Sequence, residues 1–182
     1  DPASWQPFNN GLFQFGANSI MTSDHTLVAC IGSYVFVHQQ GALPWRDATA
    51  DALQGRLPLV VYRHADFLFL GTTGGIYKSD LSATVWQRAD IRALPEQDIS
   101  AFAAHGIHLF AGLNYRSEHW IWSSEDNGAT WEIRAHEFAY LYGLFPAHGR
   151  MWACRTDGLW SIDLSGWTSV AAENGHVPGA PY

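Results

Sequence analysis

A tryptophan that follows another aromatic residue at a fixed distance recurs along this chain, and it constrains the fold more than any other feature. The two aromatic residues are nine positions apart in three copies: Phe36 and Trp45, Tyr77 and Trp86, Trp122 and Trp131. In a fourth copy, Trp160 and Trp167, they are seven positions apart. Recurrence at a period of about 40 residues is the signature of a repeat architecture, in which each unit stacks on its neighbours.

A histidine at a turn also recurs once in each unit, 17 to 20 positions after a tryptophan: His25, His64, His105 and His148. Imidazole is a common metal ligand, so a ring of four histidines raises the question of a metal site. A residue that recurs in every unit is better explained by a structural role, such as a hydrogen bond to a turn carbonyl of its own unit. We therefore expect no metal and no cofactor.

Each unit contains short apolar runs, such as 67–70 and 151–154, that are bounded by turn-forming residues. These runs are too short for buried helices and too rich in aromatic residues, so they predict β-strands. Four short antiparallel strands in about 40 residues make one blade of a β-propeller. The sequence thus predicts an all-β fold, a single β-propeller domain over 1–182 with about four four-stranded blades. The predicted blades are 19–48, 57–89, 99–134 and 140–170.

A sandwich built from the same strands is an alternative, but it needs no fixed period. Closure of the ring leaves three arrangements open, because residues 1–10 contain a further tryptophan, Trp5, and are expected to form an extra terminal strand. The chain is a small propeller with one redundant strand, part of a larger propeller, or half of a homodimer in which a second chain completes the ring. An unclosed end exposes sheet faces and edges, which makes completion by a second copy physically reasonable.

The third unit contains the segment SEDNGATW at 124–131. Its Asn-Gly pair is a strong hairpin signal, since both residues accept positive φ. The preceding Asp126 is suited to accept hydrogen bonds from turn amides, and Trp131 offers a large apolar face to neighbouring sheets.

This segment resembles the Asp-box pattern, S-x-D-x-G-x-T-W, of the BNR repeats in sialidase-like β-propellers. The positions that match are Ser124, Asp126, Gly128, Thr130 and Trp131. The other units keep only parts of the pattern, such as Asp80 in the second unit and Asp163 in the fourth. The resemblance implies a structural turn remote from any active site.

For a sialidase, the same resemblance implies an arginine triad, a Tyr-Glu pair that supplies the nucleophile and an Asp that acts as the acid. The early F/Y-R-I-P segment of those enzymes is absent, and the nearest run, 55–58, reads GRLP. Glu118 and Asp157 lie on turns of neighbouring blades, where two carboxylates could face each other as in a glycoside hydrolase. We expect no catalytic activity. If the chain is an enzyme, the activity that these residues indicate is that of a glycosidase.

The irregular third unit is the most informative region for function, because loops on rigid scaffolds carry binding sites. About four residues are inserted between its second and third strands, at 114–120. Aromatic and arginine side chains are enriched at binding hot spots. The predicted binding residues are Tyr115, Arg116, Glu118, His119 and Trp120, together with Arg155, Asp157 and Thr73 on neighbouring turns. The alternative is a longer hairpin with Trp120 packed underneath.

Composition limits the classes of partner. The net charge is −7 with a single lysine, so the chain does not attract nucleic acid. No apolar run approaches the roughly 20 residues that span a membrane. The start at Asp1-Pro2 fits either a mature end left by processing or an end introduced by cloning. The location therefore stays open, with a secreted or extracytoplasmic one favoured.

The two cysteines, Cys30 and Cys154, occupy equivalent positions in different units. Such positions should lie farther apart than the roughly 4.4–6.8 Å between Cα atoms that a disulfide permits, so we expect free, buried thiols. Taken together, the sequence predicts a non-catalytic binding or scaffold module that recognises a protein or polar ligand through the loops between second and third strands. A glycan-binding lectin or glycoside hydrolase-like propeller is the alternative.

Overall fold

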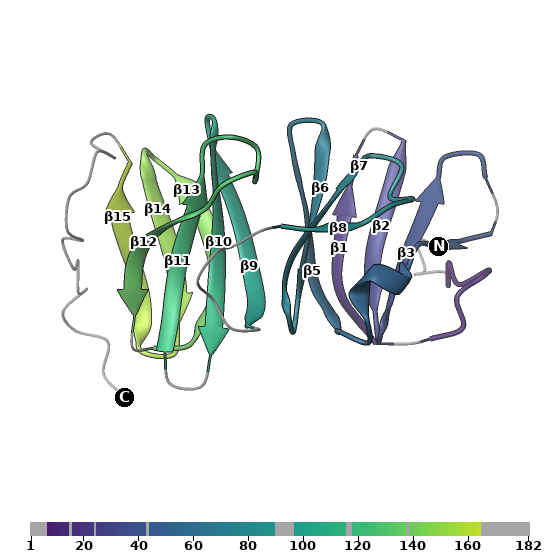
Figure 1. The fold of residues 1–182 in the computed structure, drawn as a ribbon, viewed down its shortest axis with the longest axis horizontal. Helices are drawn as coiled ribbons and strands as arrows, with labels where there is room; N and C mark the ends of the chain where they lie inside the picture. Colours follow the sequence, from purple (N-terminus) through teal and green to yellow (C-terminus); the bar gives the residue numbers. More distant parts are fainter. Residues whose placement is uncertain are drawn as a thin grey trace, which may run out of the picture.

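The computed structural model describes residues 7–14, 16–23, 25–42, 44–89, 97–115, 118–137 and 139–164. Within these residues the fold is all-β, with four antiparallel sheets and one short 3₁₀ helix (Figure 1). Each sheet is formed by strands that are consecutive in the sequence and hydrogen-bonded in that order. This is the blade arrangement of a β-propeller, as the repeat predicts.

The strands of the four blades have the following bounds. Blade 1 contains β1 (Ala17–Thr22), β2 (Thr26–Ile31), β3 (Tyr34–Gln39) and β4 (Arg46–Asp47). Helix η1 (Asp51–Leu53) leads to blade 2, with β5 (Pro58–His64), β6 (Phe67–Thr72), β7 (Gly75–Asp80) and β8 (Gln87–Arg88). Blade 3 contains β9 (Asp98–His105), β10 (His108–Tyr115), β11 (Glu118–Ser124) and β12 (Glu132–Glu137). The described part of blade 4 has β13 (Leu141–Ala147), β14 (Arg150–Arg155) and β15 (Gly158–Asp163).

The first strand of every blade carries a β-bulge at the same place in its register. The residue without a partner is Asn18 in β1, Leu59 in β5, Ser100 in β9 and Tyr142 in β13. A bulge bends the strand and increases its twist. Because the bulges align, they also define which positions of different blades are equivalent. Cys30, Gly71, Gly112 and Cys154 are one such set, since each pairs with the residue that follows the bulge.

The core lies in layers between successive blades. One layer joins Val28, Cys30 and Val37 of blade 1 to Leu70 and Trp86 of blade 2, and comparable layers join blades 2 and 3 and blades 3 and 4. The prediction that the repeated tryptophans pack at blade boundaries is confirmed for Trp86, between blades 1 and 2, and for Trp131, between blades 2 and 3. Trp45 is buried on the outer face of blade 1, among residues of that blade, and Trp5 and Trp167 lie outside the described residues.

The four blades form an open arc. First strands of neighbouring blades contact one another in the order β1, β5, β9 and β13, and among the described strands no comparable contact joins blade 1 to blade 4. Figure 1 shows these two blades at opposite ends of the molecule, with β15 at the left and β3 toward the right. In the part of the chain that the structure describes, each end blade therefore has one face without a neighbouring blade.

Two local expectations need correction or refinement. The predicted loop at 114–120 is a regular hairpin, because Asn114 pairs with His119 and Tyr115 with Glu118, which leaves only 116–117 between the strands. Both thiols are free as expected, but only Cys30 is buried, and Cys154 is partly exposed. No described helix is long and apolar enough to cross a membrane.

Candidate functional site

The turns between second and third strands of the blades lie at one end of the molecule, which we call the b–c face. It includes Ser33, Thr73, Asp157, the end of β10 and the start of β11. Helix η1 and the end of β10 both lie toward the lower edge of Figure 1. This is the face on which the sequence predicts the binding residues.

The extended hairpin of blade 3 holds blade 4 in place. The Asn114 side chain accepts a hydrogen bond from the backbone N–H of Leu141 (3.0 Å) and donates one to the Leu141 carbonyl (3.0 Å). It also donates to Ser100 Oγ (2.7 Å), which in turn donates to the Leu141 carbonyl (2.9 Å). The four added residues therefore make a buried polar contact between two blades, in addition to any role at the surface.

His119 belongs to this contact and is buried, although the sequence predicts it at the surface. Its Nδ1 lies 2.7 Å from Asn114 Oδ1, and its ring meets the edge of Tyr140 with centroids 5.6 Å apart. Burial lowers the pKa of His119, and the charges of Arg155 and His136 act in the same direction. A neutral imidazole that donates to Asn114 fits both observations. The buried side chain packs beneath the b–c face, against Asn114 and Tyr140.

Arg155 and Asp157 pair with each other within the last b–c turn. The guanidinium donates to both carboxylate oxygens of Asp157, at 2.9 and 2.7 Å. The same guanidinium lies over the Trp160 ring at 4.4 Å, and Trp160 Nε1 donates to Asp157 at 3.0 Å. The Asp157 side chain remains partly exposed, whereas that of Arg155 is nearly covered. Asp157 is therefore available to a ligand and Arg155 mainly positions it.

The remaining predicted residues have different surroundings. Trp120 is partly buried in the core between blades 2 and 3 and stacks on His136, with centroids 5.3 Å apart. Thr73 accepts from the Leu57 N–H at 3.0 Å, which ties its turn to the start of blade 2. Glu118 is exposed at the first position of β11. Arg116 lies outside the described residues, and of Tyr115 only the backbone is described, at the end of β10.

Two tyrosines that the sequence analysis does not predict as binding residues lie close to His119 and to the last b–c turn. Tyr140 and Tyr142 are both exposed, Tyr142 to 63%, and their ring centroids are 5.2 Å apart. Tyr142 is the bulged residue of β13, and the carbonyl of Tyr140 accepts from the Thr156 N–H of the neighbouring b–c turn. An exposed tyrosine pair at the start of β13 offers a contact surface with little conformational entropy to lose. No pattern in the sequence marks this pair, because the bulge at Tyr142 is defined by the pairing of β13 with β14.

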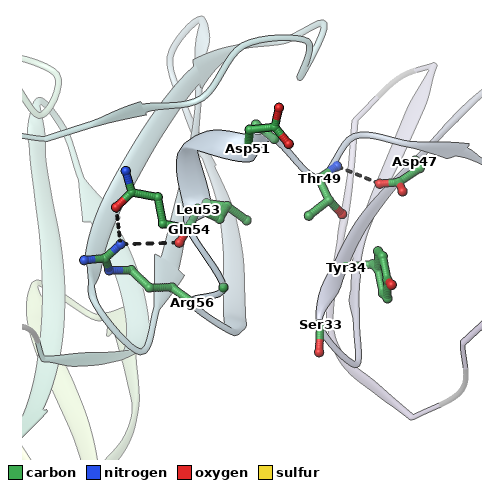
Figure 2. A pocket seen from close by; sticks show the side chains of 10 residues that line it. Ser33, Tyr34, Asp47, Thr49, Asp51, Leu53, Gln54 and Arg56 are labelled. Atoms are coloured by element: carbon green, nitrogen blue, oxygen red, sulfur yellow. Dashed lines mark hydrogen bonds between the residues drawn. The ribbon is translucent and has the colours of Figure 1, made fainter.

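A pocket of about 440 Å³ opens on the same face between blades 1 and 2, where the b–c turn of blade 1 meets the connection to blade 2 (Figure 2). Tyr34, Asp47 and Thr49 line one side, and Gln54 and Arg56 line the other. The pocket is supported from within, because Thr49 Oγ1 accepts from the Val35 N–H and the Thr49 N–H donates to Asp47, both at 2.8 Å.

The far wall of the pocket depends on an unusual backbone. Gln54 has a φ of 50°, the left-handed region that non-glycine residues rarely adopt. Arg56 donates to Gln54 Oε1 at 3.3 Å and to the Leu53 carbonyl at 3.4 Å. Its side chain lies flat on Gly74 of the next b–c turn, where a Cβ would collide with it. No local pattern in the sequence links Tyr34 to Arg56, so the pocket was not predicted.

The described part of the b–c face is rich in carboxylates and tyrosines. Its acidic side chains are Asp47, Asp51, Asp98, Glu118 and Asp157, and its tyrosines are Tyr34, Tyr140 and Tyr142. Burial raises the pKa of Asp98. Arg155 and Arg88 are engaged with the protein itself, the latter with the Gly74 carbonyl at 3.0 Å. In the described residues no group of three acidic, histidine or cysteine side chains is close enough to hold a metal ion.

The SEDNGATW segment forms the turn between β11 and β12, at the end of the blade opposite the b–c face. Asp126 accepts from the Thr130 N–H (2.8 Å), the Thr130 hydroxyl (2.6 Å) and the Ser124 hydroxyl (2.8 Å). Desolvation opposes ionisation of Asp126, but these hydrogen bonds outweigh it and lower the pKa to about 2. Asn127 and Gly128 have positive φ, and Trp131 Nε1 donates to the Gly128 carbonyl at 3.2 Å. The segment is a structural turn.

The fold defines the protein as an all-β propeller with about four blades. No protein-family model matches the chain, and no curated protein matches its sequence. Solved structures do match. The computationally designed Ika4 protein has a TM-score of 0.64 at 12% identity, covering 88% of this chain and 99% of its own. The Dos1 propeller has a TM-score of 0.64 at 12% identity, covering 81% of this chain and 45% of its own.

A third similar structure is YCF48 bound to D1 peptide, with a TM-score of 0.59 at 16% identity, covering 82% of this chain and 49% of that one. This chain therefore spans less than half the length of the Dos1 and YCF48 chains. At such identities the likeness shows the propeller fold alone.

Proposed function

We propose that this propeller is a non-catalytic binding module that recognises an extended, basic segment of a protein partner across the b–c face. The observation that carries the proposal is the exposed Tyr140–Tyr142 pair on the same face as the exposed Glu118 and as Asp157, whose carboxylate is half-exposed and paired with Arg155. Tyrosine rings supply apolar contact area, and carboxylates select cationic side chains.

The pocket between blades 1 and 2 extends the same surface. Its Asp47 carboxylate and Tyr34 ring repeat the combination of acidic and aromatic groups found at blade 4. A net charge of −7 adds a long-range field that speeds the approach of a cationic partner. An extended peptide is the ligand that can contact both regions, because it can cross the face from one blade to another.

The comparison with YCF48 supports the proposal at the level of the fold, because that propeller was solved with a peptide bound. The turn at 124–131 supports a related proposal, that the chain is a divergent member of the Asp-box superfamily. Within this turn the residues that match the pattern bond to one another: Asp126 accepts from the Thr130 N–H, and Ser124 Oγ accepts from the Gly128 N–H. The other blades retain less of the pattern.

The test is selection of ligands from a phage library of random 12-residue peptides, followed by measurement of Kd by fluorescence anisotropy. We expect the selected peptides to be enriched in Lys and Arg and to bind more weakly as salt is raised, since salt screens exposed charges. The double variant Tyr140→Ala and Tyr142→Ala should bind about 30-fold more weakly, as expected for loss of aromatic anchors worth about 2 kcal/mol.

A matched control is Ile133→Ala, which removes an equally exposed apolar side chain from the outer strand β12. It should leave Kd unchanged. Selection of no peptide, or of acidic peptides, contradicts the proposal, as does unchanged binding in the tyrosine variant. A glycan array probed in parallel separates the alternative, because capture of a sugar without any peptide would identify a lectin.

A further inference from the structure

The outward face of blade 4 presents side chains that the other blades bury against their next neighbour. Phe145 of β13 lies opposite Trp152 of β14, and Cys154 lies opposite Leu159 of β15. We call Phe145, Trp152, Cys154 and Leu159 the blade-4 face. Phe145 is 56% exposed and Leu159 is 48% exposed.

The same two positions are filled in every internal junction. The equivalents of Trp152 are Val28, Phe69 and Phe110, and the equivalents of Leu159 are Val35, Ile76 and Ile121. All six of these side chains are buried. The blade-4 face therefore has the composition of one half of a blade junction, and within the described part of the chain no blade supplies the other half.

The outward face of blade 1 is the complementary half. Trp45 Nε1 donates to the Phe8 carbonyl at 2.9 Å, just as Trp86 Nε1 donates to the Ala48 carbonyl at 3.0 Å. Phe8 thus takes the place of Ala48, the residue that follows the outer strand of a preceding blade. Phe13 takes the place of Leu53, because Phe13 follows Phe8 by five positions just as Leu53 follows Ala48 by five. We call Phe8, Phe13, Phe36 and Trp45 the blade-1 face.

The exposed fractions show that this half is also incomplete. Phe8 is 50% exposed where Ala48 is 6% exposed, and Phe13 is 53% exposed where Leu53 is 2% exposed. The rings of Phe13 and Phe36 are in edge contact, with centroids 5.1 Å apart, so the Phe13 side chain already lies against the blade. Among the described residues, no blade covers the outer side of either phenylalanine.

We propose that the blade-1 face of a second copy of this chain docks on the blade-4 face and reproduces an internal blade junction. The two faces are opposite halves of one repeated interface, so each supplies the shape that the other lacks. They lie at opposite ends of the arc, and the described strands of blades 1 and 4 make no comparable contact within one chain (Figure 1). The contact is head-to-tail, and such contacts close into a ring when the rotation permits. Two copies then give one ring of eight blades with two identical junctions.

The experiment is native mass spectrometry and light scattering of the purified chain, with three variants. The wild type should have twice the mass of the 20.2 kDa chain. Phe13→Asp places a charge on the blade-1 face, and the double variant Phe145→Asp and Leu159→Asp places two charges on the blade-4 face. Each should weaken self-association by about a hundredfold or more, because a charge would be buried without a partner. Val85→Asp, at an exposed apolar residue outside both faces, should leave the assembly intact.

Mixing the two defective proteins tests the head-to-tail geometry. Each still has one intact face of opposite kind, so the mixture should form a species of double mass that neither forms alone. A wild-type chain that stays at single mass overturns the proposal. An assembly that survives Phe13→Asp but not the blade-4 variant also overturns it, because that result requires two blade-4 faces in contact. Circular dichroism checks that all variants are folded, which their exposed positions predict.

Discussion

The junction between blades 2 and 3 and the outward face of blade 4 use the same register position in different ways. Gly71 faces blade 3, and a Cβ there would lie 2.7 Å from the Ile99 carbonyl oxygen. Gly112 faces blade 4, where a Cβ would collide with the Leu141 side chain. Cys154 holds the equivalent place on the open face and is partly exposed. Cys30 holds the same place in the junction between blades 1 and 2 and is fully buried. The exposure of the residue at this position thus depends on whether a blade lies next to it.

Exposed aromatic residues also differ between the rim of a closed junction and the open face of blade 4. Tyr140 and Tyr142 lie at the rim of a closed junction, where buried His119 and Asn114 support the strand beneath them. Phe145 lies on a sheet face without a covering layer. Aromatic residues with a polar group suit a surface that alternates between water and ligand, whereas phenylalanine on an open sheet suits permanent burial.

The largest expected difference between a closed junction and the open face concerns tryptophan. Trp86→Ala removes a fully buried ring and its hydrogen bond to the Ala48 carbonyl, so it should lower the free energy of unfolding by about 3–5 kcal/mol. Trp152→Ala, on the blade-4 face, is the matched control. In the Phe13→Asp protein, where no second copy covers that face, it should cost about 1 kcal/mol, because its ring is only partly buried. Urea denaturation measures both. Equal losses would contradict the distinction between the faces.

Removing the polar contact between blades 3 and 4 should have the next largest effect. Asn114→Ala leaves the N–H and carbonyl of Leu141 without their side-chain partner, and a buried polar group left unsatisfied costs about 1–3 kcal/mol. The variant should also raise the pKa of His119, because the ring gains access to water. Asn18→Ala is the control, since Asn18 makes a single hydrogen bond of 3.4 Å to the Pro58 carbonyl. NMR titration of His119 and thermal melts distinguish the two variants.

Glycine at the closed junction gives a smaller and more local test. Gly71→Ala forces the Ile99 backbone away and should destabilise the fold by about 1–3 kcal/mol, the usual range for overpacking. Cys154→Val at the equivalent place should change stability by less than about 0.5 kcal/mol. If both substitutions are neutral, the inner strands do not approach each other as closely as the account requires.

The smallest expected effect is the pH dependence of the turn at 124–131. The pKa of Asp126 is lowered in the folded state from 3.8 to about 2, so its contribution to stability is present above about pH 4. That contribution is lost as the pH falls toward 2, because the folded protein must then protonate a carboxylate that its hydrogen bonds hold ionised. Asp126→Asn should flatten the stability profile between pH 4 and 2 relative to the wild type. Identical profiles would show that the turn hydrogen bonds do not bind the ionised form.

Much of the fold was predictable because it rests on local, repeated signals. The spacing of Trp45, Trp86 and Trp131 predicts the blades, and the SEDNGATW segment predicts its own turn from residues within eight positions. The burial of His119 was not predictable in this way. Its partner Asn114 is held by Leu141, which is 27 positions away on the next blade. An insertion that reads as a loop becomes a hairpin because the neighbouring blade satisfies its polar groups.

The candidate site was predictable only in part for the same reason. The face was identified from the order of the strands, and Glu118 and Asp157 are exposed on it. The pocket joins Tyr34 to Arg56, and the tyrosine pair depends on a bulge at Tyr142. Both arise from how blades meet, which a pattern within one blade does not encode.

The most direct test of the contrast between filled and unfilled junctions is the reactivity of the two thiols. Cys30 is buried between blades 1 and 2, which raises its pKa to about 12, whereas the equivalent Cys154 is partly exposed. The measurement is native-state alkylation at pH 8, followed by peptide mapping, in the Phe13→Asp protein so that no second copy covers blade 4. Cys154 should react at least about a hundredfold faster than Cys30, since a buried thiol without thiolate is inert. Equal rates at the two cysteines would contradict the account.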